Sequence, residues 1–374
     1  MGSLTQNDQI ENGSNLLLGC APLYPPLALF HSLGITPQVL WGLKDSLTGL
    51  GESDKHLQNY ACSVARCLTQ YVLSERGANL KGLFMYNACD TLRNLPEILK
   101  RGLAEAGRKL PVFSIHIPMG SSGRDLNSMY LEQEIGFLIR ELEDAFAVSF
   151  SAERFKRSTQ IYAEIKNLFM QMDALVAAGK LRFDEYAQFA RQGCMCPVEQ
   201  LIGSLRTRLQ DFDAAELDGL DDNMGPGGVI LSGILPPPPE ISRAIEDADL
   251  RIVGNDIALL SRSIFHIPDP TENPQAYYRN YYHRHYPCPT LLHTADSRIE
   301  VLMNLVKTRK ATGIIFIGEK FCEYEYFEMP HLEKRLREQG LHSLFLEISI
   351  DDNEHIDAFK TRIEAFSELM LKSA

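Results

Sequence analysis

The chain has 374 residues, of which 45% are hydrophobic and 23% charged, so it is long enough for two domains that each bury a core. The formal charge of −12 at pH 7 disfavours nucleic acid or an anionic membrane as the main partner. No run of about 18 apolar residues is present that would cross a bilayer.

The first residues, 1–14, are polar and lack the basic and apolar regions of a signal peptide. We therefore expect a cytoplasmic protein whose cysteines are reduced. In a reducing compartment a thiol is buried, reactive or a metal ligand, and is rarely part of a disulfide. The eight cysteines are Cys20, Cys62, Cys67, Cys89, Cys194, Cys196, Cys288 and Cys322.

Residues 1–150 alternate short apolar runs with amphipathic segments. The apolar runs predict strands at 15–19, 82–87 and 112–117. The amphipathic segments predict helices at 25–34, 54–73, 92–106 and 126–146. This alternation is typical of a parallel sheet with helices on its faces.

Residues 151–212 show only helical patterns, and the acidic, turn-rich segment 213–227 that follows predicts a linker. The later apolar runs predict strands at 228–233, 251–254, 314–318 and 343–348. The segments between them predict helices at 239–247, 297–308, 330–339 and 354–372.

The predicted fold class is therefore α/β, with two doubly wound parallel-sheet domains of the Rossmann or flavodoxin type. We expect the first domain at 1–150 and the second at 228–374. The helical segment 151–212 is expected as an insertion between them, followed by the linker 213–227.

Three cysteines share one predicted position, the turn that follows a strand: Cys20, Cys89 and Cys322. Ligands of open α/β sheets bind outside the carboxyl ends of the strands. The positive end of the next helix also stabilises a thiolate over a thiol. We therefore predict a cleft between two domains that collects thiols, the alternative being that buried thiols fall at strand ends by chance.

The other motifs favour structural roles. Cys67 lies on the apolar stripe of its predicted helix, and the C-x-C at 194–196 is more typical of a structural turn than of a metal site. A zinc site is conceivable from the spacing of His283, His285, Cys288 and His293, but that stretch shows no regular pattern. There is no C-x₂-C pair, Walker A loop, G-x-S-x-G, H-E-x-x-H or G-x-G-x-x-G.

Three segments surround a cysteine with a distinctive motif: YACSVARC (60–67), NACDTLRNLP (87–96) and GEKFCEYEYFEMP (318–330). Weaker matches are GCAPLYPPLALFHSLGITPQVLWG (19–42), GVILSGIL (228–235) and TRIEAFSELM (361–370). Together they resemble the 2-hydroxyacyl-CoA dehydratase and benzoyl-CoA reductase subunits. The length suits the smaller of the two related subunits in that family.

The resemblance implies that three cysteines hold one [4Fe–4S] cluster and leave one iron for a non-protein ligand. Carried over to this sequence, the ligands are Cys62, Cys89 and Cys322. Cys20 is replaced in this set, because it aligns with a GC-x-P element that the family does not usually use as a ligand. The cluster would then join the two domains.

The resemblance also implies an oxygen-sensitive heterodimer with a larger homologous subunit, an acyl-CoA substrate and an ATP-hydrolysing iron–sulfur activator as electron donor. The Glu-Tyr-Glu-Tyr after Cys322 resembles benzoyl-CoA reductase subunits, so we predict ATP-coupled reduction of an aromatic acyl-CoA. Dehydratase subunits, which tend toward Asp-Pro-Glu there, are the first alternative.

Two further alternatives stay open. A double-cubane reductase would take extra iron ligands from Cys20, Cys67 and Cys288, although CDTLR differs from the CDG-type run of those proteins. A two-lobed small-molecule binding protein with incidental thiols is the other.

Charged residues near the motifs are candidates for lesser roles. Arg93, Arg124 and Arg298 could contact CoA phosphates, although surface arginines are more often only solvated. Asp90 and Glu323 directly follow two of the cysteines, and we expect them to cap helices rather than deliver protons.

Overall fold

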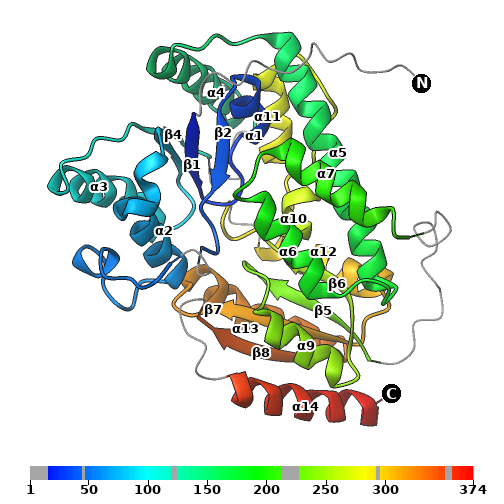
Figure 1. Cartoon of the computed structure of the whole chain (residues 1–374). Helices are drawn as coiled ribbons and strands as arrows, with labels where there is room; N and C mark the ends of the chain where they lie inside the picture. Colours follow the sequence, from blue (N-terminus) through cyan, green and yellow to red (C-terminus); the bar gives the residue numbers. More distant parts are fainter. Residues whose placement is uncertain are drawn as a thin grey trace.

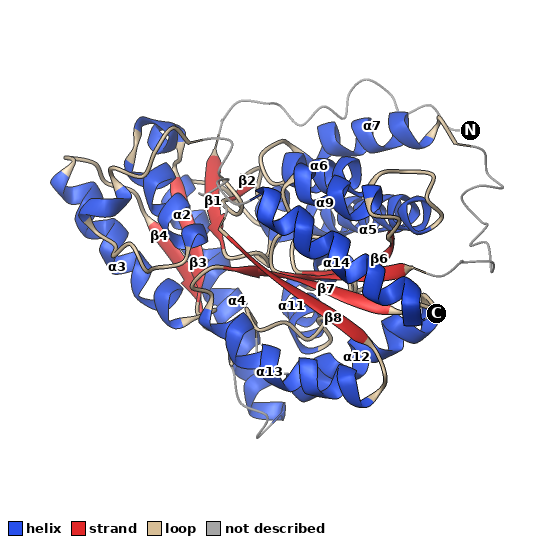
Figure 2. Ribbon diagram, turned by 90° about the horizontal axis from the view of Figure 1, so that it is seen from below, coloured by secondary structure: helices blue, strands red, loops and turns tan. Residues whose placement is uncertain are grey.

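The computed structural model describes residues 16–43, 47–118, 124–212, 227–291, 295–349 and 356–373. Within them, two four-stranded sheets have the strand orders β2-β1-β3-β4 and β6-β5-β7-β8, and every strand pair is parallel (Figure 1). Figure 2 shows the strands of both sheets covered by helices. The predicted α/β class with two parallel sheets is confirmed.

The first sheet is built from the N-terminal part of the chain. Its strands are β1 (Leu17–Ala21), β2 (Thr36–Val39), β3 (Gly82–Tyr86) and β4 (Val112–Ile115). Its helices are α1 (Leu27–Ser32), α2 (Ser63–Leu73), α3 (Asp90–Glu105) and α4 (Arg124–Phe146), with 3₁₀ turns η2 (Ser53–Lys55) and η3 (Glu75–Asn79). Every residue of β3 is buried, as expected of a parallel strand with helices on both faces.

The second sheet repeats this plan. Its strands are β5 (Gly228–Gly233), β6 (Arg251–Ile257), β7 (Gly313–Glu319) and β8 (His342–Ile348). Its helices are α9 (Pro239–Asp247), α10 (Ser261–Ile264), α11 (Pro274–His283), α12 (Ala295–Thr308), α13 (Glu323–Glu338) and α14 (Ile356–Ser373). β5 and β7 are buried along their whole length, which explains why their sequences are continuous apolar runs.

Three helices connect the two sheets in the chain: α5 (Ala152–Ala177), α6 (Phe183–Gly193) and α7 (Val198–Leu209). The long helix α5 packs on α1 of the first half and on β6 of the second (Figure 1). Its Asp173 accepts a hydrogen bond from Asn255 at 3.0 Å and pairs with Arg309 at 2.5 Å. The predicted linker falls at 213–226, outside the described residues, with Gly227 at its end.

Several local predictions were wrong, among them the start of the helix expected at 330–339, which begins already at Glu323 as α13. The helix expected at 54–73 begins only at Ser63, because the side chain of Gln70 accepts hydrogen bonds from the backbone N–H groups of Glu52 and Ser53 and holds the preceding segment as a turn. The short edge strand β2 was missed. The stretch expected to have no regular pattern contains α11, whose N-cap Asn273 accepts a hydrogen bond from Ala276 N–H.

Helix α11 also returns to the first half of the molecule. It packs on α4, and the hydroxyl of Tyr282 donates to the carbonyl of Tyr24 at 2.9 Å. None of the helices in the described ranges is both long enough and apolar enough to cross a membrane.

Candidate functional site

Three cysteines occupy the same local position, the residue directly before a helix. Cys62 is the N-cap of α2, Cys89 that of α3 and Cys322 that of α13. The first N–H groups of a helix have no partner within the helix, so a side chain at the N-cap can accept hydrogen bonds from them. Each thiol therefore lies at the positive end of a helix dipole.

Backbone N–H groups act on each of these sulfurs to a different degree. Leu92 N–H donates a hydrogen bond to Cys89 Sγ at 3.4 Å. The sulfurs of Cys62 and Cys322 accept no such capping bond, although the nearby N–H groups of Ala65 and Glu325 lower their thiol pKa values. Hydrogen bonds to sulfur favour the thiolate, which is the form that binds metals.

The two halves of the molecule meet at these cysteines. Cys89 follows β3 and Cys322 follows β7, each the third strand in chain order of its sheet. The hydroxyl of Ser63, next to Cys62, donates to the carboxylate of Glu319 at the end of β7. The structure thus brings together residues from the first sheet's helices and from the second sheet.

Burial and neighbouring charges raise the thiol pKa values of Cys62 and Cys322. Burial raises the pKa of Cys62 to about 12, against the lowering effect of backbone N–H donors, and the charges of Cys89 and Glu319 raise it further. Burial also raises the pKa of Cys322 well above its usual value, with added repulsion from Glu325, Cys62 and Cys89. Three partly buried thiolates would therefore disfavour one another unless a cationic group joined them.

The three cysteines are the candidate ligands of this site. Across the described ranges, no group of three or more His, Cys, Asp or Glu side chains is placed to hold a metal ion. The donor set of three thiols, one at each of three helix starts, is of the chemical type that iron–sulfur clusters use.

The turn that carries Cys322 is strained. Phe321 has φ of +64°, in the left-handed region that residues with a β-carbon rarely adopt, and its side chain is 46% exposed. Such conformations persist where surrounding contacts enforce them and are concentrated at functional sites. Here the strained residue places Cys322 at the start of α13.

Two buried carboxylates beside Cys322 were missed by the sequence analysis. Glu325 accepts a hydrogen bond from Glu319 N–H at 3.1 Å, and burial raises the pKa of Glu325 to about 7 despite the opposing charge of Arg298. The signal was the spacing C-E-Y-E, which places a glutamate three residues after the N-cap, as in a capping box. The expected caps, Asp90 and Glu323, instead occupy the first helical position, because the cysteines themselves are the N-caps.

Arg298 is not a surface residue available to a CoA phosphate, as was expected. Its guanidinium is buried, pairs with Glu328, and donates to Ser232 at 3.0 Å and Asp256 at 3.2 Å. The other two candidates differ: Arg93 is half-exposed and pairs with Asp90 at 3.5 Å, and Arg124 begins α4.

The remaining cysteines have separate surroundings. Cys20 lies inside β1 rather than after a strand, is fully buried, and its thiol donates to the carbonyl of Leu18 at 3.5 Å. Cys67 is buried in the core on α2. Cys288 accepts hydrogen bonds from Tyr24 at 3.3 Å and Arg262 at 3.4 Å.

The zinc hypothesis gains no support. His283 is hydrogen-bonded to Ser128 at 3.1 Å, while His285 is hydrogen-bonded to the carbonyl of Tyr286 at 2.9 Å. His293 lies outside the described residues. The C-x-C turn has a structural role. The carbonyl of Cys194 accepts a hydrogen bond from the N–H of Val39, the last residue of the edge strand β2, at 2.8 Å.

Comparison with known proteins agrees with this geometry. The family model of the 2-hydroxyglutaryl-CoA dehydratase D-component matches residues 22–370. The chain belongs to this family. The resemblance seen in the sequence is thereby confirmed.

Curated relatives match almost the whole chain at low identity. The (R)-phenyllactyl-CoA dehydratase beta subunit of Clostridium sporogenes is 22% identical, covering 96% of this chain and 93% of the relative. The beta subunit of the (R)-2-hydroxyglutaryl-CoA dehydratase of Acidaminococcus fermentans is 25% identical, covering 94% and 91%. One of the benzoyl-CoA reductase subunits of Thauera aromatica is 24% identical, covering 87% and 83%. The family therefore consists of enzyme subunits, of both dehydratases and a reductase, and this chain is one of them.

Proposed function

We propose that this chain is the smaller subunit of an ATP-coupled acyl-CoA enzyme, and that Cys62, Cys89 and Cys322 hold a [4Fe–4S] cluster between its two sheets. The observation that carries the proposal is the meeting of three N-cap thiols from α2, α3 and α13. The proposed domain division is the one expected from the sequence, so the first domain would supply two ligands and the second one.

When bound, the cluster would supply an electron at low potential, with a value set by burial, net charge and hydrogen bonds to sulfur. The chain's own residues control each of these. Leu92 N–H of α3 donates to the sulfur of Cys89, and the N-termini of α2 and α13 direct their positive dipole ends at Cys62 and Cys322, which stabilises added negative charge there. Glu319 and Glu325 oppose it, and the nearby guanidinium of Arg298 offsets Glu325.

Glu325 is the buried carboxyl group beside Cys322, and burial raises its pKa against the opposing charge of Arg298. Asp90, by contrast, has a side chain that is 70% exposed and paired with Arg93. Of the two carboxylates, Glu325 is therefore the one that lies inside the molecule at this site.

The proposed reaction is reduction of an aromatic acyl-CoA, supported by the Glu-Tyr-Glu-Tyr sequence that begins α13. Dehydration of a 2-hydroxyacyl-CoA is the second candidate, supported by the names of the dehydratase relatives. In either case we propose an ATP-hydrolysing iron–sulfur activator as the electron donor.

The test uses the complex reconstituted anaerobically with its larger subunit, the activator and ATP. It is supplied with benzoyl-CoA in one assay and with a panel of 2-hydroxyacyl-CoAs in another, and the products are separated by chromatography. We expect a ring-reduced diene thioester from benzoyl-CoA. Release of water from a hydroxyacyl-CoA without reduction of benzoyl-CoA would assign the chain to the dehydratases.

A larger homologous partner is proposed from the names of the relatives and from exposed aromatic side chains near the cysteines. Tyr60 is 67% exposed and Phe327 80% exposed, and both lie within five residues of a proposed ligand. Exposed aromatic side chains are enriched where proteins associate. Turnover by the isolated chain with a chemical reductant would contradict an obligatory partner.

A further inference from the structure

A chain of buried hydrogen bonds crosses from the first half of the molecule to α13, the helix whose N-cap is Cys322. It starts at Tyr24, which follows β1 and is buried. The hydroxyl of Tyr24 donates a three-centre hydrogen bond to the carbonyl of Ala258 at 3.2 Å and to the sulfur of Cys288 at 3.3 Å. Ala258 and Cys288 belong to the second half, so this bond joins the two halves.

The position of Tyr24 is itself fixed by the second half. Its carbonyl accepts a hydrogen bond from the hydroxyl of Tyr282 at 2.9 Å. Its ring packs against that of His285, with centroids 4.1 Å apart. Tyr24 is therefore held through both its backbone and its side chain, as an anchor from the first half that is inserted into the second.

Cys288 is the junction at which this anchor meets the buried charges of the second half. Its sulfur accepts a hydrogen bond from Arg262 Nη1–H at 3.4 Å. It is also hydrogen-bonded to the hydroxyl of Thr290 at 3.1 Å. Because the sulfur lies between these two groups and Tyr24, an apolar replacement would remove a buried hydrogen-bond partner from each of them.

The chain continues through one carboxylate to α13. Arg262 donates from Nε to Asp256 at 2.8 Å, and Asp256 also accepts a hydrogen bond from Arg298 at 3.2 Å. Arg298 donates in turn to Glu328 on α13. Asp256, Arg262 and Arg298 are buried, and hydrogen bonds in such a low-dielectric interior are stronger than those in water.

This chain and a second contact hold the segment around Cys322 from both sides. Glu319, three residues before Cys322, accepts the hydrogen bond from Ser63 of the first half. Glu328 lies six residues after Cys322, which is less than two helical turns. A bond that holds Glu328 therefore also restrains the N-cap of the same helix.

We propose that Tyr24 and Cys288 are positioning residues, which hold α13 and its N-cap Cys322 in a fixed place relative to the first half of the molecule. Cys322 then stays in register with Cys62 and Cys89, the two proposed ligands of that half. Cys288 acts through its hydrogen bonds and not as an iron ligand. The use of Cys322 rests on the proposed function, whereas the attachment of α13 is measured independently of it.

Hydrogen–deuterium exchange of the full-length chain, measured by mass spectrometry, tests this attachment without any iron. Cys288→Ala should speed amide exchange in peptides that cover 319–330 by about tenfold, because the buried neighbours of the sulfur lose a partner. Peptides that cover 82–105, with β3 and α3, should exchange as in wild type. Cys288→Ser, which keeps a hydrogen-bonding atom, should restore most of the protection.

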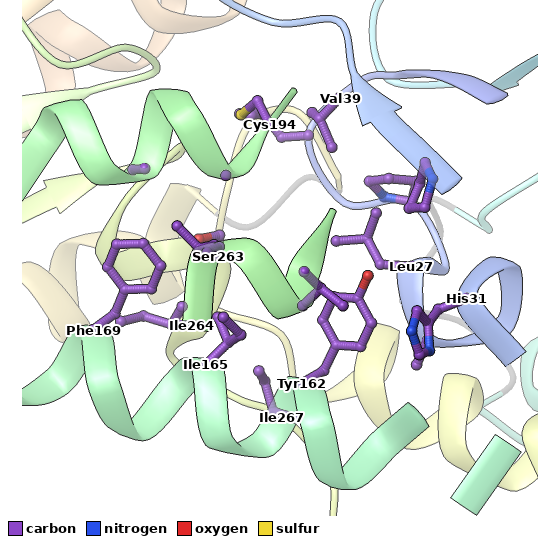
Figure 3. A pocket seen from close by; sticks show the side chains of 18 of the residues that line it. Leu27, His31, Val39, Tyr162, Ile165, Phe169, Cys194, Ser263, Ile264 and Ile267 are labelled. Atoms are coloured by element: carbon purple, nitrogen blue, oxygen red, sulfur yellow. The ribbon is translucent and has the colours of Figure 1, made fainter. Parts of the chain in front are cut away.

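Cys194→Ala is the matched control, because Cys194 is a buried cysteine outside this chain of hydrogen bonds. Figure 3 shows its side chain at the wall of a cavity beside α5, which no residue of the chain from Tyr24 to Glu328 lines. It should leave exchange in 319–330 unchanged. Tyr24→Phe removes a single hydroxyl, so it keeps the test valid if Cys288→Ala does not fold, and it should speed that exchange by about threefold.

The second readout is the retention of iron by the anaerobically reconstituted chain. An iron chelator should remove iron from Cys288→Ala about tenfold faster than from wild type, and from Cys288→Ser and Cys194→Ala at the wild-type rate. Absence of iron from wild type would refute the proposed cluster but not the attachment, which the exchange decides. Exchange in 319–330 that stays unchanged in both Cys288→Ala and Tyr24→Phe would overturn the proposal. So would an increase that is equal over the whole chain.

Discussion

The two sheets have the same strand order, yet the carboxyl ends of their strands carry different chemistry. In the first half, the ends of β1 and β3 present tyrosines and thiols, such as Tyr24, Tyr86 and Cys89. In the second half, the end of β6 presents Asp256, which pairs with Arg262 at 2.8 Å and Arg298 at 3.2 Å, all of them buried. One topology therefore supports a neutral edge and a charged edge that face each other.

The comparison of the two halves separates the features that follow from the shared topology from those that each sequence adds. The position after the third strand carries a cysteine N-cap in both halves, because that turn leads directly into a helix. Among the described residues, the charged network of Asp256, Arg262 and Arg298 lies in the second half. Burial alone would raise the pKa of Asp256, but the charges of Arg262 and Arg298 lower it to about 2. The second half thus depends on compensation between charges, and the first on packing.

The largest expected loss of stability comes from a substitution that removes this compensation between charges. Asp256→Asn leaves the buried guanidinium of Arg262 without its carboxylate and leaves Arg298 with Glu328 alone, and losing one partner of a buried ion pair costs about 3–5 kcal/mol. Urea unfolding should show a loss of that size in the free energy of unfolding. The control Asp357→Asn, whose side chain is 98% exposed, should change it by less than about 0.5 kcal/mol. Equal stabilities for the two variants would contradict the charged-edge account.

The neutral edge should respond to acid through His285, which follows α11 in the second half and packs against Tyr24 of that edge. Burial lowers the pKa of His285 to about 4, and its ring packs against Tyr24 with centroids 4.1 Å apart. Between pH 6.5 and about 4 the unfolded chain binds a proton that the folded chain does not, so stability falls as the pH is lowered. The shift corresponds to a loss of roughly 3 kcal/mol.

The measurement compares urea unfolding of wild type and His285→Phe at about pH 7 and about pH 4.5, on either side of most of that window. The difference between the two proteins removes the contribution of all other titrating groups. Wild type should lose more stability on acidification than the variant. Parallel pH profiles would show that His285 is not held neutral.

The contact between the two halves gives a smaller effect. Ser63→Ala removes the hydrogen bond from α2 to Glu319 and should reduce the free energy of unfolding by about 1–2 kcal/mol. The matched control is Ser204→Ala on the exposed face of α7, where the hydroxyl bonds only within its own helix. If both variants unfold at the same urea concentration, Ser63 does not join the halves.

The smallest effect concerns association with the proposed larger subunit. Phe327→Ser should weaken the complex about tenfold, because exposed aromatic residues contribute strongly at interfaces. Met170→Ser, at a 53% exposed apolar residue on α5, should not change the affinity. Analytical ultracentrifugation of the mixed subunits measures both. An equal change in the two variants would place the interface elsewhere.

The sequence predicted the features that depend on local pattern. The strands around 82–87 and 314–318 are buried apolar runs, and the turns after them lead into helices where Cys89 and Cys322 lie. The set of Cys62, Cys89 and Cys322 came from the family resemblance. The position after a predicted strand selected Cys20 instead, because the end of β1 was placed two residues too early.

The features that were missed depend on tertiary contacts. α11 is rich in tyrosine, which is a poor helix former, and it is stabilised by packing on α4 and by contacts of its tyrosines with α1 and its flanking segments. Arg298 was expected at the surface, because its partners Asp256 and Ser232 lie 42 and 66 residues away in the chain. Distant pairs of this kind leave no periodic signal in the sequence.

The central claim is that three N-cap cysteines hold one cluster, and iron content tests it most directly. Iron and sulfide are measured after anaerobic reconstitution, with electron paramagnetic resonance of the reduced protein, for wild type and for single cysteine variants. We predict about four irons per chain. Cys62→Ala, Cys89→Ala and Cys322→Ala should each lose most of them, whereas Cys194→Ala and Cys196→Ala should keep them. Full iron content in any of the first three variants, or about eight irons that fall on substitution of Cys20 or Cys288, would contradict the claim.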